Sequence, residues 1–393
     1  MYNNVKNVIK PVKLDFSDKE INRISKKLVE ILKSGNLILG KYTEKFEKNF
    51  SEYNNVKNSV ALNSGTSALE VALSLSLKCC RFYDERIKCN NSCRKKVLVQ
   101  SNTNFATVAA IIRAGAIPEF VDFDPDYFSP SYEQILKSYK KNKNIAGCIV
   151  VHIGGIIHPE IIKISKFCKK NNLFLIEDCA HAHGSTFRGQ KAGTFGDFGC
   201  FSFFPTKVIT TIEGGILTTK YDKNVELIKS FRNQGKRGGS FGGTHYDLGN
   251  SWRMSEISSF IGLLQLKKLN LIIKKRKKAV EQMIKSVKKT KLLNYCKVEH
   301  MDECSNYKFI IIAKTKKTKN KLINSFRKKG IFVGGDVYNT PCHQQPVFLK
   351  HVNKNLKLPL TNKFCKLQIC PPVHSKLKKN DIKRICSTIE DLN

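Results

Sequence analysis

Residues 173–219 constrain the fold of this chain more than any other stretch. The stretch begins with an apolar segment, 173–176, which is typical of a buried strand and leads directly into the acidic pair Glu177 and Asp178. It ends with the aromatic run CFSFF, a single lysine, Lys207, and a Gly-Gly turn before another apolar strand. Small residues and glycines crowd the middle, which suits backbone that packs closely around a flat ligand. We therefore expect a ligand site between these strand ends.

A carboxylate at one strand end and a lysine displayed after a second strand are the two protein groups that pyridoxal 5′-phosphate (PLP) chemistry requires. Taken alone, Asp178 could instead be a helix N-cap, and Lys207 could be one of many surface lysines. The segments on either side of Lys207, FSFFPT and VITTIEGG, are apolar or glycine-rich, unlike the lysine-rich surface runs. The surroundings of Lys207 therefore favour the catalytic interpretation.

A second motif, NSGTSALEVALSLSL at 63–77, indicates a place where a phosphate could bind. A strand ends there, and an amphipathic helix begins whose free N–H groups and dipole favour an anion. Gly65 permits close approach, and Thr66 adds a hydroxyl donor. The same pattern is also an ordinary helix start. Asn104 and Phe105 occupy another strand-to-helix junction, where a planar cofactor could stack, although a Phe there is more often core.

Apolar strands alternate with amphipathic helices between about residues 59 and 219, which is typical of a parallel α/β sheet. The segment 145–155 is almost entirely apolar, as a strand buried on both faces is. Ahead of this region, Ser17 and Glu20 form a capping-box pattern that predicts a helix ending at Gly35.

From residue 251 the pattern changes to long amphipathic helices, with strands expected at 308–314 and 331–335. We expect an N-terminal arm and a large PLP-binding α/β domain over 1–245, with a mainly parallel central sheet flanked by helices. A smaller C-terminal α+β domain is expected over 246–393. This boundary falls at the end of a glycine-rich loop, and such loops often cover sites.

The formal net charge of +37 invites a nucleic-acid interpretation. The lysines are spread over predicted helices and loops, however, and no basic-aromatic ladder is present. Nucleic acid is therefore not the expected partner. No run of about eighteen apolar residues occurs, so a membrane is not expected as a partner either. The N-terminus has no apolar signal segment, and we expect a cytoplasmic protein.

The chain has fourteen cysteines, most of them scattered. One cluster, Cys79, Cys80, Cys89 and Cys93, lies in a polar segment, 78–96, that we interpret as an insertion loop. A zinc site is the alternative there, but the spacing matches no standard zinc pattern. No metal site is predicted.

The motifs in order resemble the DegT/DnrJ-type family of sugar aminotransferases, PLP enzymes of the aspartate aminotransferase fold (fold type I). The resemblance covers nearly the whole chain and runs through GNLILGKYTEKFEKNF, NSGTSAL, GAIPEFVDFDPD, IEDCAHAHGS, GTFGDFGCFSFFPTKVITTIEGG, WRMSEISSFIGLLQL and YNTPCHQQPVF. The ordered set is highly specific, whereas no single member is.

This resemblance implies a catalytic set. Lys207 matches the family's Schiff-base lysine, and Asp178 matches the aspartate that pairs with the pyridine nitrogen. His181 falls where the family has His or Gln near the ring hydroxyl. Relatives that dehydrate a sugar at C3 carry His in place of the lysine, so Lys207 argues for amino transfer.

The resemblance also implies cofactor contacts. Asn104 stands where the family usually has an aromatic residue stacked on the ring, and Phe105 is its neighbour. An asparagine that reaches the partner subunit's phosphate in many members falls at Ser251, next to Asn250. The positions that match the phosphate contacts are Gly65, Thr66 and Ser202.

The function implied is a homodimeric aminotransferase with shared active sites, which uses PLP and passes through pyridoxamine 5′-phosphate (PMP). Glutamate is the implied donor and a nucleotide-diphosphate keto sugar the acceptor, in amino-sugar or polysaccharide biosynthesis. Lys236 or Arg237 is expected to meet the diphosphate. Two alternatives stay open: a PLP enzyme that aminates a non-nucleotide cyclitol or ketone, and a non-catalytic regulatory member of the fold.

Overall fold

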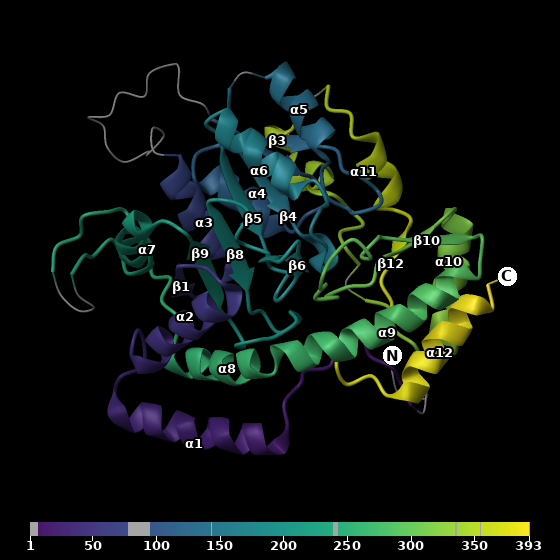
Figure 1. Ribbon diagram of the computed structural model, residues 1–393, viewed down its shortest axis with the longest axis horizontal. Helices are drawn as coiled ribbons and strands as arrows, with labels where there is room; N and C mark the ends of the chain where they lie inside the picture. Colours follow the sequence, from purple (N-terminus) through teal and green to yellow (C-terminus); the bar gives the residue numbers. More distant parts are fainter. Residues whose placement is uncertain are drawn as a thin grey trace.

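A seven-stranded sheet forms the centre of the structure (Figure 1). The computed structural model describes residues 7–77, 95–142, 144–238, 243–334, 336–353 and 355–392. The strands lie in the order β1-β9-β8-β5-β4-β2-β3, and only β9 runs antiparallel to its neighbours, which confirms the mainly parallel sheet. Their bounds are Asn58–Leu62 (β1), Lys96–Gln100 (β2), Ile117–Val121 (β3), Ile145–Val151 (β4), Phe174–Asp178 (β5), Phe198–Ser202 (β8) and Gly215–Thr219 (β9).

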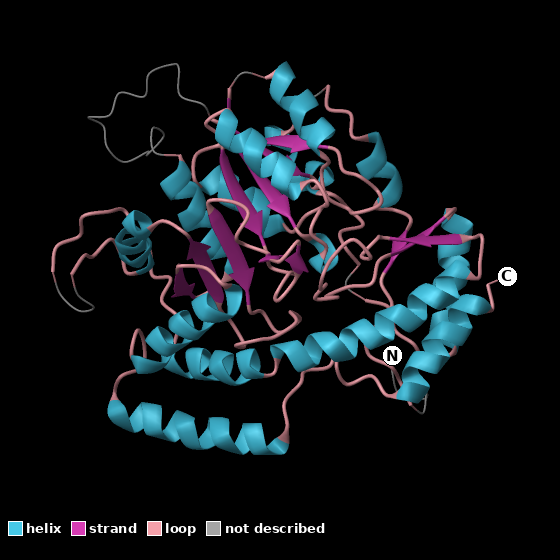
Figure 2. Ribbon diagram, viewed as in Figure 1, coloured by secondary structure: helices cyan, strands magenta, loops and turns pink. Residues whose placement is uncertain are grey.

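Side chains of the sheet alternate between two apolar cores on its opposite faces. In β4, Ile149 and Val151 enter one core, whereas Cys148 and Val150 enter the other. Helices α3, α4 and α7 contribute to the first core, and α2, α5, α6, α8 and the start of α9 to the second. Figure 2 shows helices surrounding the central strands. Burial on both faces explains the nearly unbroken apolar sequence of this strand. The helix bounds are Lys41–Asn54 (α2), Gly65–Ser76 (α3), Phe105–Arg113 (α4), Tyr132–Lys141 (α5), Ile161–Lys170 (α6), Val225–Arg232 (α7), Glu256–Lys267 (α8) and Leu269–Lys288 (α9).

A third core lies in the C-terminal part of the chain. Its small antiparallel sheet has the order β10-β11-β12 and packs with α10, α12 and the second half of α9. Helix α9 joins two cores, because Ile273 belongs to the core beneath the large sheet and Met283 to the C-terminal one. A domain boundary near residue 246 stays a prediction. The bounds are Leu293–Tyr295 (β10), Ile311–Ala313 (β11), Lys316–Lys328 (α10), Pro359–Phe364 (α11), Gln368–Ile369 (β12) and Lys379–Glu390 (α12), and the remaining hairpin is Thr186–Phe187 (β6) with Gln190–Lys191 (β7).

The strand expected at 331–335 is wrong. Ile331 forms only an isolated parallel bridge with Ile9, in which Ile9 N–H donates to Gly330 and Phe332 N–H donates to Ile9. The next donor of such a ladder would be residue 11, which is a proline without an N–H, so pairing stops. The partners of β11 are instead β10 and β12, which are too short to show a strand period in sequence.

The predicted N-terminal helix is present as α1, Asp18–Ser34, with the Ser17/Glu20 capping box and Gly35 in the left-handed region at its end. Ile31 is buried, but one apolar face of the helix is open to solvent, since Ile21, Leu28 and Leu32 are 48%, 39% and 58% exposed. The opposite, basic face lines a groove of about 920 Å³ shared with α2 and α8.

A helix that crosses a membrane must be both long and apolar, and none of the helices in the described parts of the chain is both.

The cysteine cluster Cys79, Cys80, Cys89 and Cys93, with nearly all of the predicted insertion 78–96, lies outside the described residues.

Candidate active site

A cavity of about 260 Å³ opens where several parallel strands end. Strand-to-helix turns supply most of its wall, as expected at the carboxyl edge of an α/β sheet. The predicted catalytic residues and the predicted cofactor contacts within one chain all line this cavity: Gly65, Thr66, Asn104, Asp178, His181, Ser202 and Lys207. The structure thus brings together residues from four separate segments, while the role of each remains a prediction.

The start of α3 forms a small cup beside the end of β8. Ser64 caps the helix by accepting the N–H of Ser67, so the N–H groups of Gly65 and Thr66 are directed to the helix entrance. A Cβ at residue 65 would lie 2.7 Å from the Cβ of Ser202, closer than side chains pack. The missing side chain therefore keeps a cradle open that matches a phosphate group.

Alanine at Gly65 is expected to weaken PLP binding by about 10- to 100-fold, because the new methyl group would press on Ser202 and fill the cradle. Absorbance titration of the cofactor-free protein measures this affinity. Ser74→Ala, on the same helix but not in the cavity wall, should bind PLP as the unmodified protein does. Equal affinity in both variants would show that the phosphate lies elsewhere.

Asp178 is a buried carboxylate that faces the cavity from the end of β5. Thr107 Oγ1 donates to it at 2.8 Å, and the N–H of Ala180 donates at 3.1 Å. Burial raises the pKa of Asp178, while these two donors and the nearby Lys207 oppose that rise. A cationic ring nitrogen is the kind of ligand that such a carboxylate lacks.

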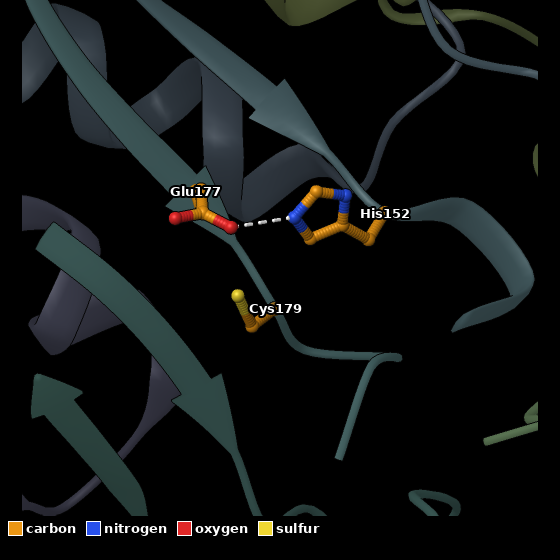
Figure 3. A group of neighbouring side chains, drawn as sticks. All are labelled: His152, Glu177 and Cys179. Atoms are coloured by element: carbon orange, nitrogen blue, oxygen red, sulfur yellow. Dashed lines mark hydrogen bonds and ion pairs between the residues drawn. The ribbon is translucent and has the colours of Figure 1, made fainter. Parts of the chain in front are cut away.

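Glu177 projects to the other face of β5, although it is adjacent in sequence. Its carboxylate lies 2.9 Å from His152 Nε2 and accepts the N–H groups of Gly193, Phe195 and Gly196 at 2.7–2.8 Å. Figure 3 shows this pair beside Cys179, three groups close enough to share a cation. Because backbone donors already occupy the carboxylate oxygens, we interpret Glu177 as the anchor of the 193–196 turn.

Lys207 lies half-buried in the cavity wall. Its pKa is lowered from 10.5 to about 8, chiefly by burial and also by Lys308, against the opposing attraction of Asp178. An amine with this pKa exchanges protons readily near neutral pH. The pKa of His181 is lowered well below 6.5, chiefly by burial, and its Nδ1 accepts the N–H of Gly154 at 3.3 Å. The neutral ring therefore carries its proton on Nε2.

The pKa of Lys207 predicts a pH dependence of folding stability in the cofactor-free protein. Between about pH 8 and the ordinary value of 10.5, the unfolded chain holds more protons at this lysine, so stability rises with pH in that window. Below it, the buried cation destabilises the fold by roughly 2–3 kcal/mol. Urea unfolding should find Lys207→Met more stable at about pH 7, with the difference fading by about pH 10, whereas exposed Lys220→Met shows no such change. A difference that does not fade would contradict this pKa.

The structure separates Asn104 from Phe105. Asn104 caps α4 by accepting the N–H of Ala106 and lines the cavity. Phe105 is 49% exposed and stacks on Phe348 outside the cavity, with ring centroids 5.4 Å apart. Asn104, not Phe105, therefore occupies the wall where a ring could stack.

Several residues expected near the substrate do not line the cavity of their own chain. Lys236 lines a different hollow beside α2 and α7, and Arg237 pairs with Asp247 at 2.9 Å. Asn250 and Ser251 are both exposed, and the N–H of Ser251 donates to the side chain of Asn250 at 2.7 Å. The segment that follows α7 extends outward (Figure 1), whereas Ser251 lies beside the end of β1, where its carbonyl accepts a hydrogen bond from Asn63 Nδ2 at 3.4 Å.

Tyr338 and Glu213 are among the wall residues that sequence reasoning missed. Tyr338 reaches the cavity from the C-terminal part of the chain, with a left-handed backbone (φ 65°) and a side-chain hydrogen bond to Asn104. Glu213 lies at the mouth, after Ile212, which also has a positive φ (75°). Both residues belong to motifs that carry the family resemblance, TIEGG and YNTPCHQQPVF, but nothing in the local pattern assigns either side chain to the cavity.

Comparison with known proteins agrees with this geometry. Residues 18–390 match the DegT/DnrJ/EryC1/StrS aminotransferase family. The chain belongs to this family. It is 30% identical over 368 residues to UDP-4-amino-4,6-dideoxy-N-acetyl-beta-L-altrosamine transaminase of Campylobacter jejuni, with 92% of each chain covered. It is also 30% identical over 359 residues to GDP-perosamine synthase of Escherichia coli O157:H7, with 90% of each covered.

Solved structures place the chain in the same group. PseC of Helicobacter pylori, an aminotransferase involved in the biosynthesis of pseudoaminic acid, matches with a TM-score of 0.85 at 25% identity, over 98% of this chain and 99% of its own. Structures with this fold hold PLP or PMP. This DegT/DnrJ/EryC1/StrS aminotransferase is thus a PLP-dependent sugar aminotransferase of fold type I, which confirms the predicted fold, enzyme class and cofactor.

Proposed function

We propose that this aminotransferase moves the amino group of L-glutamate to a nucleotide-linked keto sugar, as a step in amino-sugar or polysaccharide biosynthesis. The observation that carries the proposal is the meeting of Lys207, Asp178 and the anion cup in one cavity. The names of the two relatives, one UDP-linked and one a GDP-sugar synthase, support a nucleotide sugar as the acceptor. Glutamate as the donor rests on the family resemblance.

Bound PLP supplies the carbonyl carbon that carries the amino group and a ring that withdraws electrons from the reacting carbon. The N–H groups of Gly65 and Thr66, with Ser202, would bind the phosphate at the start of α3. Asp178 would accept a hydrogen bond from the ring nitrogen and keep that nitrogen protonated. The Nζ of Lys207 would take the proton from the donor carbon and pass it to the cofactor carbon that carries the amino group, and in the second half-reaction it would move a proton from that carbon to the sugar carbon.

His181 and Tyr338 complete the wall. The Nε2–H of His181 is free to donate to an oxygen on the cofactor ring, since Nδ1 already accepts the N–H of Gly154. Tyr338, from the C-terminal part of the chain, and Asn104, from the start of α4, also line the cavity.

The test is product identification with a panel of acceptors. The enzyme with glutamate should convert a nucleotide 3-keto or 4-keto sugar to its amino sugar and leave a free cyclitol ketone unchanged. Turnover of the free ketone alone would instead support the cyclitol alternative. No amino transfer to any acceptor, combined with salt-dependent retention on DNA, would support the regulatory alternative.

We also propose a homodimer with shared active sites. The apolar face of α1 is exposed to solvent, and its burial against another surface would be favourable. Residues 236, 237, 250 and 251 do not line the cavity of their own chain. A second copy supplies both a surface for α1 and a cavity for this loop. Light scattering should report a dimer for the unmodified chain and a monomer for the double variant Leu28→Asn/Leu32→Asn. Leu271→Asn, which replaces an exposed leucine of α9, serves as the control and should stay dimeric.

A further inference from the structure

Tyr307 is a buried residue just before β11 that contacts two of the predicted site residues at once. Its ring stacks on the imidazole of His181, with centroids 4.1 Å apart and planes inclined by 25°. The Nζ of Lys207 lies 5.2 Å from the centroid of the same ring. Its hydroxyl lies 3.2 Å from Oγ1 of Thr206, the residue before the lysine. The side chain of Tyr307 thus stacks on His181 and contacts the amine of Lys207.

The segment around Tyr307 also holds the backbone on which His181 depends. Ser305 Oγ donates to the carbonyl of His181 at 2.6 Å. The N–H of Lys308 donates to the carbonyl of Gly154 at 3.3 Å, and Gly154 in turn donates its N–H to Nδ1 of His181. A Cβ at Gly155 would lie 2.0 Å from Ser305 Oγ, so the two segments meet in close contact. This contact fixes where the donor to Nδ1 stands.

We propose that Tyr307 is a positioning residue of the amino-transfer reaction, which fixes the plane and the Nε2-protonated tautomer of His181 and holds the amine of Lys207 over its ring. The proposal rests on the roles proposed above for His181 and Lys207. The ring of Tyr307 beneath Nζ favours the charged form of Lys207, because the face of an aromatic ring is electron-rich. Stacking restricts the imidazole to one plane, in which only Nδ1 meets Gly154.

The other charged or titratable groups around Lys207 raise or lower its pKa in known directions. Asp178 at the end of β5 favours its charged form, and Lys308 disfavours it. His181 and His183 are buried, and their pKa values lie well below neutrality, so both rings are neutral. Loss of the Tyr307 ring should therefore move the titration of Lys207 downward.

Two substitutions separate the ring from the hydroxyl. Tyr307→Phe keeps the stack and the cation contact and loses only the bond to Thr206. Tyr307→Leu removes the ring. Long-range proton–nitrogen NMR of nitrogen-15-labelled histidine in the cofactor-loaded enzyme reports the tautomer of His181. The pH dependence of Lys207 labelling by an amine reagent in the cofactor-free chain, read by peptide mass spectrometry, reports the lysine.

The phenylalanine variant should keep the Nε2–H tautomer and the titration midpoint of the unmodified enzyme. The leucine variant should show both tautomers, a midpoint about half a pH unit lower, and a kcat about 10-fold lower with KM for the sugar unchanged. An unchanged tautomer and midpoint in Tyr307→Leu would overturn the proposal, whatever the activity. If that variant fails to fold, Tyr307→Met takes its place. Both readouts are independent of the substrate, so a wrong acceptor assignment leaves this result standing.

Discussion

Replacing Lys207 with alanine is expected to lower kcat/KM for amino transfer by about 10³-fold or more, because the cavity loses the amine that carries the proton. Among the described residues, Lys207 is the one lysine in the cavity wall. Lys308 cannot take over, since it does not line this cavity and its Nζ donates to the carbonyl of Gly334 at 3.0 Å. Steady-state kinetics with glutamate and the keto sugar measure the loss.

A second measurement separates chemistry from binding. Borohydride reduction followed by protein mass spectrometry should trap the cofactor covalently on the unmodified protein and leave Lys207→Ala without added mass. Lys220→Ala, which replaces an exposed lysine just after β9, is the control and should match the unmodified protein in both assays. Retention of a tenth of the activity in Lys207→Ala would rule out its proposed role.

Asp178→Asn is expected to lower kcat/KM by about 10²- to 10³-fold, because a neutral amide cannot keep the ring nitrogen protonated. The folded state should not suffer, since burial already disfavours the charge of this carboxylate and raises its pKa. Kinetics and urea unfolding are measured on the same preparation.

The neighbouring carboxylate provides the matched control. Glu177→Gln should destabilise the protein by roughly 1–3 kcal/mol, because backbone N–H groups of the 193–196 turn lose a charged acceptor. The folded, cofactor-loaded fraction should keep its kcat. The two adjacent variants are thus expected to show opposite profiles, one defective in chemistry and the other in stability. The reverse pattern would mean that the two faces of β5 have been assigned the wrong roles.

Sequence reasoning predicted the residues whose local setting carries a signal. Asp178 ends an apolar strand, Gly65 opens a helix after a strand, and Lys207 stands in an apolar, glycine-rich run. Parallel strands end at one edge of a sheet, so such residues converge without any knowledge of distant contacts. Local patterns also predicted the mainly parallel sheet, from the alternation of strands and helices, and helix α1, from its capping box.

The rest depended on contacts between segments far apart in the chain. Tyr307 meets His181 through the packing of the C-terminal part against the 153–155 turn, and no periodicity announces such a stack. Tyr338 enters the cavity from an irregular link with an unusual φ. The strand expected at 331–335 failed because its partner segment holds Pro11, a fact that local propensity does not contain.

The position of β1 in the sheet has a consequence for how the chain is made. β1 ends at Leu62 and lies at the sheet edge, where its one neighbour, β9, ends at Thr219. At about 5–20 residues per second, a ribosome needs roughly 10–30 s to travel between these points. Throughout that interval the emerging chain has Gly65 but lacks the complete β9, which lies between β1 and β8 and so brings Ser202 of β8 beside Gly65. The nascent chain must therefore wait for β9 before its cofactor can assist folding, and arrested chains that end before β9 should not retain PLP.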